Sequence, residues 1–147
     1  MNSYDTVQLT FLSTGTVGIR PSMSNQPAIG LLFRRIGSLC DRNWTKSLPV
    51  GVFLIHHPEG LFLFDTGQSP FCIDSSYFPR VALFNSLLSQ FTIEHKDGIL
   101  EQLHGPGIKA TELKGVILSH LHNDHAGGLE HLIAEVPELP IFISREH

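Results

Sequence analysis

Four side chains that commonly bind metal ions lie within six residues near the end of the chain. Residues 119–128 read SHLHNDHAGG and contain His120, His122, Asp124 and His125. On an extended segment, His120 and His122 project from the same face, so both imidazoles can bind one ion. Asp124 and His125 follow where the chain turns toward a predicted helix, and we expect them to point elsewhere, at a second ion. The spacing predicts half of a two-metal hydrolytic centre.

The residues around this cluster favour a functional site. Gly127 and Gly128 follow it, and they allow the backbone to turn tightly without side chains that crowd the ions. The alternative is an exposed histidine-rich loop that binds metal ions without a function, but the predicted strand before the cluster and helix after it favour a site. Zinc is the expected metal because imidazole is a ligand that it prefers, although iron and manganese satisfy the same ligands. The histidines without such spacing are expected at the surface or at helix ends: His56, His57, His95, His104 and His131.

The elements that must hold the cluster are mostly strands at first and alternate with helices later. Strands are predicted over residues 7–15, 27–35, 50–57, 61–64, 114–119 and 141–144, and helices over 81–91, 97–104 and 127–136. Residues 58–60, PEG, join two apolar runs and indicate a β-hairpin. Asp97 is the expected N-cap of its helix, and Pro137 ends the last helix. This order predicts an α/β layered domain.

Composition excludes several other classes of protein. The 147 residues are 41% hydrophobic and 16% charged, which fits one globular domain with a core. The net charge of −4 does not favour a nucleic-acid partner, and apolar runs of only four residues predict no membrane span. Cys40 and Cys72 are too few for a disulfide framework, so we expect two free, buried thiols. Without a recognisable secretion signal, the cytoplasm is the predicted compartment.

Two segments resemble a known family. VILSHLHNDHAGG, at 116–128, is similar to the signature of the metallo-β-lactamase-fold hydrolases, and GLFLFDTG, at 60–67, resembles an earlier landmark of that fold. The resemblance implies an αββα sandwich with two zinc ions at one edge of its sheets. It implies that His120 and His122 bind the first ion, and that Asp124 and His125 bind the second.

The resemblance also implies roles for two carboxylates. Asp124 helps to orient the attacking hydroxide and protonates the leaving group. Asp65, in the DTG sequence, lies behind the metal ligands in their second shell and steadies their loop by hydrogen bonds. A plain turn-capping aspartate after a strand is the alternative for Asp65.

One departure from the family concerns the end of the chain. The family completes its centre with a histidine, a bridging aspartate and a final histidine, all well downstream of the cluster, whereas this chain ends at His147. We therefore expect residues 1–147 to be the N-terminal part of a single metallo-β-lactamase-type domain, about the first half of the sandwich and inactive by itself. His147 follows a strand too closely to be a ligand. The uncovered sheet of such a half predicts self-association.

The closest resemblance within the family is to the lactonases that open acyl-homoserine lactones. It implies a metal-dependent hydrolase of a lactone or other ester-like bond, with a small-molecule substrate attacked by metal-bound hydroxide. Three alternatives stay open. LTFLSTGTVGIRPS, at 9–22, resembles the opening strand of the tRNA 3′-processing endonuclease. A thioesterase of the glyoxalase type has the same fold, and a remnant without catalysis is the non-enzyme alternative.

Overall fold

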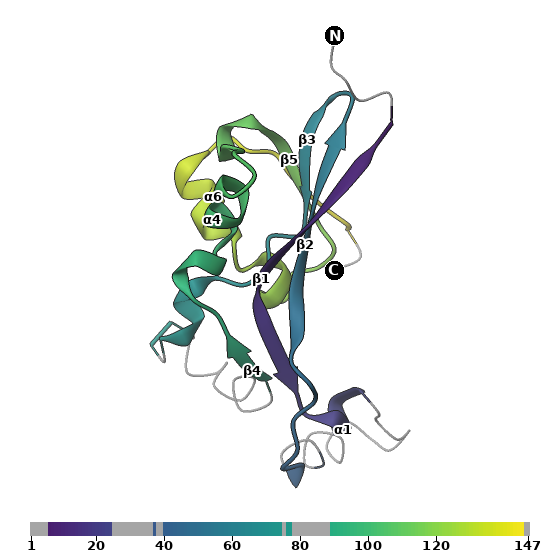
Figure 1. The fold of residues 1–147 in the computed structure, drawn as a ribbon, viewed down its shortest axis with the longest axis vertical. Helices are drawn as coiled ribbons and strands as arrows, with labels where there is room; N and C mark the ends of the chain where they lie inside the picture. The colour runs from purple at the N-terminus through teal and green to yellow at the C-terminus, as the bar shows by residue number, and fades with distance from the viewer. Residues whose placement is uncertain (1–5, 25–36, 38–39, 75, 78–88, 146–147) are drawn as a thin grey trace. The chain divides into compact units, whose positions relative to one another are not determined.

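The computed structural model describes residues 6–24, 37, 40–74, 76–77 and 89–145 (Figure 1). The contacts between residues divide the chain into two compact units. The first comprises Met1–Gly15, Val50–Pro70 and Ile93–His147, and the second comprises Thr16–Pro49 and Phe71–Thr92. All five predicted site residues belong to the first unit.

The first unit is built on a mixed sheet. Its strands are β1 (Gln8–Ile19, as far as Gly15), β2 (Leu48–His57, from Val50), β3 (Gly60–Phe64), β5 (Leu113–Leu118) and β6 (Ile141–Ile143), in the order β1-β2-β3-β5-β6. Strands β2 and β3 pair antiparallel, with Phe53 opposite Phe64. Strands β3 and β5 are parallel, as are β5 and β6. The predicted hairpin and the strands near 114–119 and 141–144 are confirmed.

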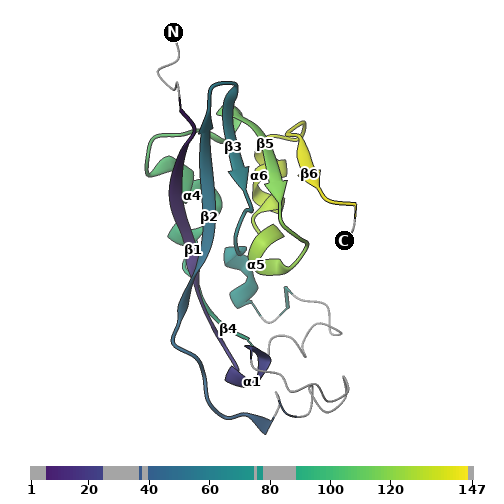
Figure 2. The same cartoon turned by 90° about the vertical axis from the view of Figure 1, so that its right-hand side faces the viewer.

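Helices cover one face of this sheet. They are α4 (Ile99–His104) and α6 (Leu129–Glu135), with the shorter segments η3 (His95–Asp97), η4 (Ala110–Glu112) and α5 (Asn123–Ala126) between the elements. Figures 1 and 2 both show α4 and α6 on the same side of the strands. The core forms there from apolar side chains of the strands, of the helices and of the segments that join them: Leu12, Val52, Leu54, Leu63, Ile99, Leu103, Ala110, Leu113, Val116, Leu118, Leu132 and Leu139. Burial of this kind of surface is the main stabilising term in a small domain.

The second unit has its own strand pair. Residues Thr16–Ile19 of β1 pair antiparallel with β4 (Ser89–Thr92). The chain leaves β1 through Arg20, whose guanidinium lies 3.6 Å from the centre of the Trp44 ring, into α1 (Pro21–Ser24). The segment η1 (Pro70–Ile73) begins at the last residue of the first unit and continues into the second.

Several predicted elements differ from those observed. The strand expected over 7–15 continues to Ile19, because residues 16–19 find a partner in β4. Residues 89–91, expected in a helix, belong to that partner, so strand pairing prevails over helical spacing. The rest of this helix, residues 81–88, and the strand expected over 27–35 lie outside the described residues.

Two helix starts and two thiols also differ from the predictions. Helix α4 begins at Ile99, and Asp97 lies in the preceding η3, where its carboxylate accepts the Glu94 N–H instead of capping α4. The last helix begins at Leu129 rather than 127. Both thiols were expected to be buried, but Cys40 is exposed and Cys72 is only half-buried. No helix among the described residues is long and apolar enough to cross a membrane.

Candidate metal centre

The candidate centre forms where two parallel strands end. Strands β3 and β5 are neighbours whose last pairing is Phe64 with Ile117, so the segments that follow them leave the same edge of the sheet. We call residues 65–69, which follow β3, the supporting loop, and residues 119–128, which follow β5, the ligand loop. The Asp65 N–H donates to the Ile117 carbonyl at 2.8 Å, which extends the ladder by one residue. Asp65 then turns the chain with a φ of 62°.

The carboxylate of Asp65 connects the two loops. It is buried and accepts three hydrogen bonds: from the Ser119 N–H at 2.8 Å, from the Ser119 hydroxyl at 2.9 Å and from His125 Nδ1 at 2.7 Å. A carboxylate only accepts, so Nδ1 of His125 carries the proton and the basic lone pair of the neutral ring is on Nε2. These are contacts of the kind that the resemblance implies for Asp65, while its role behind bound metal ions stays a prediction.

Three imidazole rings gather in the ligand loop. The ring centres of His120 and His122 are 4.5 Å apart, and those of His120 and His125 are 4.1 Å apart. The expectation that His120 and His122 share a face agrees with this distance, but His125 does not point away from them. It lies in the one-turn helix α5, and its bond to Asp65 holds its ring beside His120.

The surroundings of His120 favour the form of imidazole that binds metals. Burial lowers the pKa of His120 below its ordinary value of 6.5, and the charges of His125 and His122 lower it further. The Ser119 hydroxyl lies 3.0 Å from His120 Nδ1 and donates its one proton to Asp65, so it accepts from this nitrogen. A neutral ring with its proton on Nδ1 presents Nε2 as the metal ligand.

Asp124 lies at the outer side of the cluster. Its Oδ2 atom is 3.6 Å from Nε2 of His125, and its side chain is about one-third exposed. The two side chains predicted to bind the second ion therefore face each other. The histidine that precedes them, His122, has an extended backbone with φ −71° and ψ 153°, as the spacing argument requires.

Backbone groups join the supporting loop to the ligand loop over a longer stretch. Both the N–H and the hydroxyl of Thr66 donate to the His125 carbonyl, at 2.7 and 2.9 Å. The Gly128 N–H donates to the Gly67 carbonyl at 3.0 Å. A Cβ atom on Gly128 would lie 2.3 Å from the Thr66 carbonyl oxygen, so only glycine permits this approach. Gly128 has an ordinary φ of −76°, so the close contact with Thr66, rather than a tight turn, is the reason for a glycine at this position.

Sequence reasoning missed the residue behind the supporting loop. Thr14 of β1 is fully buried, and its hydroxyl accepts the Gln68 N–H at 3.1 Å and donates to the Val50 carbonyl at 3.3 Å. A Cβ atom on Gly67 would lie 1.9 Å from this hydroxyl oxygen. No local pattern marks Thr14, because its partner Gln68 is 54 residues away along the chain.

A second missed contact fixes the start of α6. The buried hydroxyl of Ser69 donates to a carboxylate oxygen of Glu130, and it lies 3.2 Å from Nε2 of His131. His131 was expected at the surface or at a helix end, but its side chain is four-fifths buried against the supporting loop. The supporting loop therefore contacts the chain on both sides of Gly127 and Gly128.

The donor set fits two partial metal sites. Among the residues that the structure describes, no three His, Cys, Asp or Glu side chains form a group that could hold a metal ion. The ligand loop instead presents pairs, which are His120 with His122 and Asp124 with His125. Imidazole and carboxylate are ligands of zinc, and a partner on Nδ1 is typical of a metal-binding histidine. The assignment of these four residues as ligands stays a prediction.

Comparison with protein families decides where the chain belongs. Residues 61–137, just over half of the chain, match the model of a family described as anti-Pycsar protein Apyc1. The chain belongs to this family. The matched residues include the supporting loop, the ligand loop and both helices that cover the sheet.

Curated relatives of the chain are lactonases. It is 32% identical over 84 residues to the N-acyl homoserine lactonase AiiB of Agrobacterium fabrum, a match that covers 57% of this chain and 30% of the relative. It is 36% identical over 83 residues to an N-acyl homoserine lactonase of Bacillus cereus, covering 56% of this chain and 32% of the relative. The match thus spans less than a third of these relatives.

Solved structures show the fold. AiiA of Bacillus thuringiensis, with N-decanoyl-L-homoserine bound at its active site, superposes with a TM-score of 0.61 at 24% identity, over 90% of this chain and 46% of that one. An N-acyl homoserine lactone hydrolase with its product at a catalytic metal centre gives 0.63 at 20% identity, over 92% of this chain and 58% of that one. The chain therefore has the αββα metallo-β-lactamase fold of the lactonases over about half of their length.

Proposed function

We propose that this chain supplies the metal-binding loop of a metal-dependent hydrolase that cleaves a lactone or another ester-like bond of a small molecule. The observation that carries the proposal is the cluster of three histidines after β5, in which the ring centres of His122 and His125 lie 4.5 and 4.1 Å from that of His120. Asp65 holds this cluster from a buried position. The relatives named as N-acyl homoserine lactonases support the type of bond.

Each ligand-loop residue has a role in this proposal. His120 and His122 hold one zinc ion, and Asp124 and His125 hold a second. Two such ions, when bound, activate water and polarise the carbonyl of the substrate. Asp124, which is partly exposed and next to His125, accepts a proton from the attacking water and returns it to the leaving oxygen. Asp65 and Ser119 keep the rings of His120 and His125 in place.

A phosphodiester is the second candidate for the bond that is cleaved. The family whose model matches residues 61–137 takes its description from an anti-Pycsar protein rather than from a lactonase. The opening strand also resembles that of a nuclease, and two metal ions are equally suited to hydrolysis of a phosphodiester. A lactone is preferred because the lactonases are 32% and 36% identical to this chain over 84 and 83 residues.

The experiment is a substrate panel with purified protein that contains this chain. Zinc-loaded protein is incubated with an N-acyl homoserine lactone, an aryl thioester and a phosphodiester, and hydrolysis is followed for each. We expect the lactone to be cleaved, and Asp124→Asn to lower kcat by about 100-fold or more with little change in melting temperature, because an amide cannot carry the proton. Asp97→Asn, far from the ligand loop in sequence, is the matched control and keeps full activity.

The outcomes separate the candidates. If only the phosphodiester is cleaved, the same ligand loop serves the second candidate function, hydrolysis of a phosphodiester. Turnover of no substrate, in protein that binds zinc, contradicts the hydrolase proposal.

A further inference from the structure

A buried hydroxyl of the supporting loop joins two ionisable side chains of α6. Ser69 is fully buried, and its hydroxyl donates to a carboxylate oxygen of Glu130. The Ser69 Oγ atom also lies 3.2 Å from Nε2 of His131. A hydroxyl has one proton to donate, so it accepts from this imidazole, which therefore carries a proton on Nε2. We call Ser69, Glu130 and His131 the serine network.

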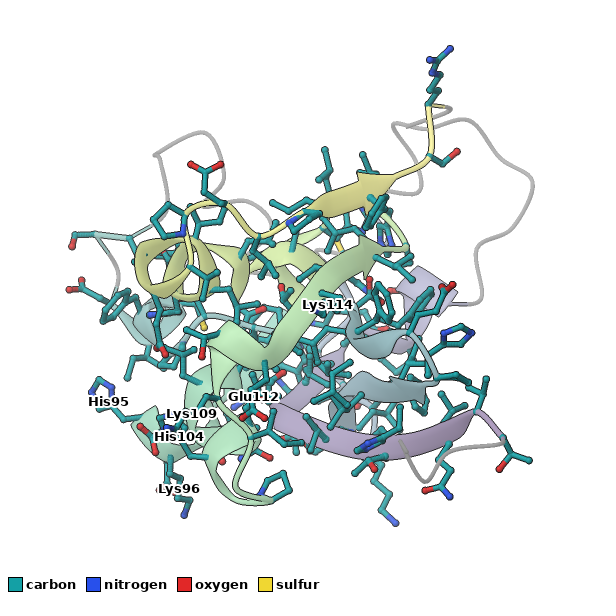
Figure 3. All side chains as sticks on the ribbon, turned by 90° about the horizontal axis from the view of Figure 1, so that it is seen from above. His95, Lys96, His104, Lys109, Glu112 and Lys114 are labelled. Carbon is teal, nitrogen blue, oxygen red and sulfur yellow. The ribbon has the colours of Figure 1, made fainter. Side chains whose placement is uncertain are left out.

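A second pair of the same ionisable residue types, on α4, is arranged differently. Glu101 Oε2 and His104 Nδ1 are 3.8 Å apart, and both side chains are more than half exposed. Figure 3 shows His104 among other ionisable side chains around α4 and η4. In the serine network, by contrast, the His131 side chain is four-fifths buried. An exposed pair contributes little to stability, whereas hydrogen bonds to a buried hydroxyl hold two segments in one arrangement.

The serine network lies directly beyond the end of the ligand loop. Gly128 is the N-cap of α6 and provides no side-chain cap, so the bonds to Ser69 help to fix where this helix begins. A Cβ atom on Gly127 would lie 2.8 Å from the Ser69 nitrogen and 3.1 Å from the Gly67 carbonyl oxygen. The backbones of the two loops are therefore in close contact at this point. A shift of α6 would move the end of the ligand loop with it.

The two predicted pairs of metal ligands depend on this contact to different degrees. His120 follows Ser119, whose N–H and hydroxyl both donate to Asp65 just after β5. Asp124 lies instead on α5, which ends directly before Gly127. The histidine of the same pair is held by Asp65 as well, so the aspartate is the ligand that depends most on the end of the loop.

We propose that Glu130 and His131 are positioning residues for the second metal ion. Through Ser69 they hold the end of the ligand loop, and thereby the carboxylate of Asp124, in the arrangement that binds this ion. This role rests on the proposed function, in which Asp124 and His125 hold the second ion. Groups behind the ligands commonly change metal affinity by about 10–100-fold without contact with the ion.

Zinc titration of purified protein that contains this chain tests the role, by calorimetry well below the melting temperature. We expect wild type to bind two ions, and Asp124→Ala identifies the second binding event because it removes a ligand of that ion alone. Glu130→Ala should weaken the second event about tenfold or more and leave the first within about twofold, because the ligands of the first ion follow β5 directly.

Two further variants show whether the effect belongs to the serine network. Glu130→Gln keeps an oxygen that accepts from the Ser69 hydroxyl, so it should restore the affinity for the second ion. Glu101→Ala is the matched control, because it removes an exposed carboxylate beside a histidine on α4, and it should titrate as wild type does.

The outcomes separate this role from the proposed function. A wild type without a second zinc event, or with one that survives Asp124→Ala, contradicts the ligand assignment and this role with it. Where that event is present and is lost in Asp124→Ala, a Glu130→Ala titration equal to wild type overturns the positioning role and leaves the proposed function intact. Equal weakening of both ions by Glu130→Ala also overturns it.

Ser69→Ala tests the hydroxyl itself and should act as Glu130→Ala does. Circular dichroism melts show which variants remain folded. If Ser69→Ala unfolds, Glu130→Ala decides, because the Glu130 side chain is 41% exposed. A folded Ser69→Ala that binds both ions as wild type does contradicts the path through this hydroxyl.

Discussion

The supporting loop and the ligand loop lie side by side and are built in opposite ways. All five residues of the supporting loop, 65–69, are buried, whereas His120, Asp124 and His125 are half-buried and His122 is exposed. The ligand loop thus keeps access to solvent, whereas the supporting loop, on which its geometry depends, is buried. Changes in the supporting loop should therefore cost stability, and changes in the ligand loop should cost metal binding with little loss of stability.

The largest effect on stability is expected for Gly67→Ala. The new Cβ atom would lie 1.9 Å from the Thr14 hydroxyl oxygen, and Gly67 has a φ of 68°. Overpacking and a left-handed backbone together should lower the free energy of unfolding by about 2–5 kcal/mol. Urea denaturation measures this change.

Gly107→Ala is the control for backbone strain. Gly107 has a φ of 81°, but a Cβ atom there meets nothing within 4 Å. Its cost should be about 1–2 kcal/mol, from the left-handed conformation alone. Equal destabilisation by the two variants would contradict the close contact between the supporting loop and β1.

Asp65→Asn tests whether the supporting loop acts on the ligands. Asparagine tolerates the φ of 62°, but an amide cannot accept all three hydrogen bonds that the carboxylate accepts. We expect a loss of about 1–3 kcal/mol in stability and of about 10–100-fold in zinc affinity. Isothermal titration well below the melting temperature separates the two effects. Zinc affinity that stays unchanged would show that Asp65 is only a turn residue.

Thr14 should have a smaller effect of the same kind. Thr14→Val keeps the shape of the side chain but leaves the Gln68 N–H without its acceptor, at about 1–2 kcal/mol. Thr14→Ser keeps the hydroxyl and should retain most of the zinc affinity. Thr10→Val on the same strand removes a hydroxyl that contacts His56 instead, and zinc affinity should not respond to it. If Thr14→Val and Thr10→Val weaken zinc binding alike, the hydrogen bond between Thr14 and Gln68 does not support the ligand loop.

The smallest effect concerns pH. Burial and the neighbouring histidines lower the pKa of His120 in the folded chain below 6.5. The unfolded chain therefore binds a proton first as the pH falls, so stability is lost from about pH 6.5 downward until the folded-state pKa is passed. Metal-free His120→Asn should lose less stability than wild type between about pH 7 and 5. A steeper loss in the variant would contradict the direction of this shift.

Local patterns predicted the parts of the molecule that depend on neighbours in sequence. The hairpin of β2 and β3, the buried strand β5 and the cluster of His120, His122, Asp124 and His125 each lie within a short segment. Strand β4 was expected to be helical, because its pairing with residues 16–19 cannot be read from residues 89–92 themselves.

At the site, the supporting loop likewise makes contacts with distant segments that its own sequence does not reveal. Its DTG sequence pointed to Asp65, but not to the contacts of Thr14 with Gln68 or of Ser69 with His131. The helical turn α5, which places the ring of His125 beside His120, was also missed. These features arise from contacts between distant segments, which periodicity does not encode.

Zinc titration of the purified chain tests the central claim, that the ligand loop binds metal. We expect calorimetry near neutral pH to show zinc binding by wild type and none of this binding by the double variant His120→Ala/His122→Ala, with similar melting curves for both metal-free proteins. His95→Ala/His104→Ala removes the same number of imidazoles from η3 and α4 and should bind zinc as wild type does. Equal zinc affinity in the two double variants would contradict the assignment of the ligand loop as a metal site.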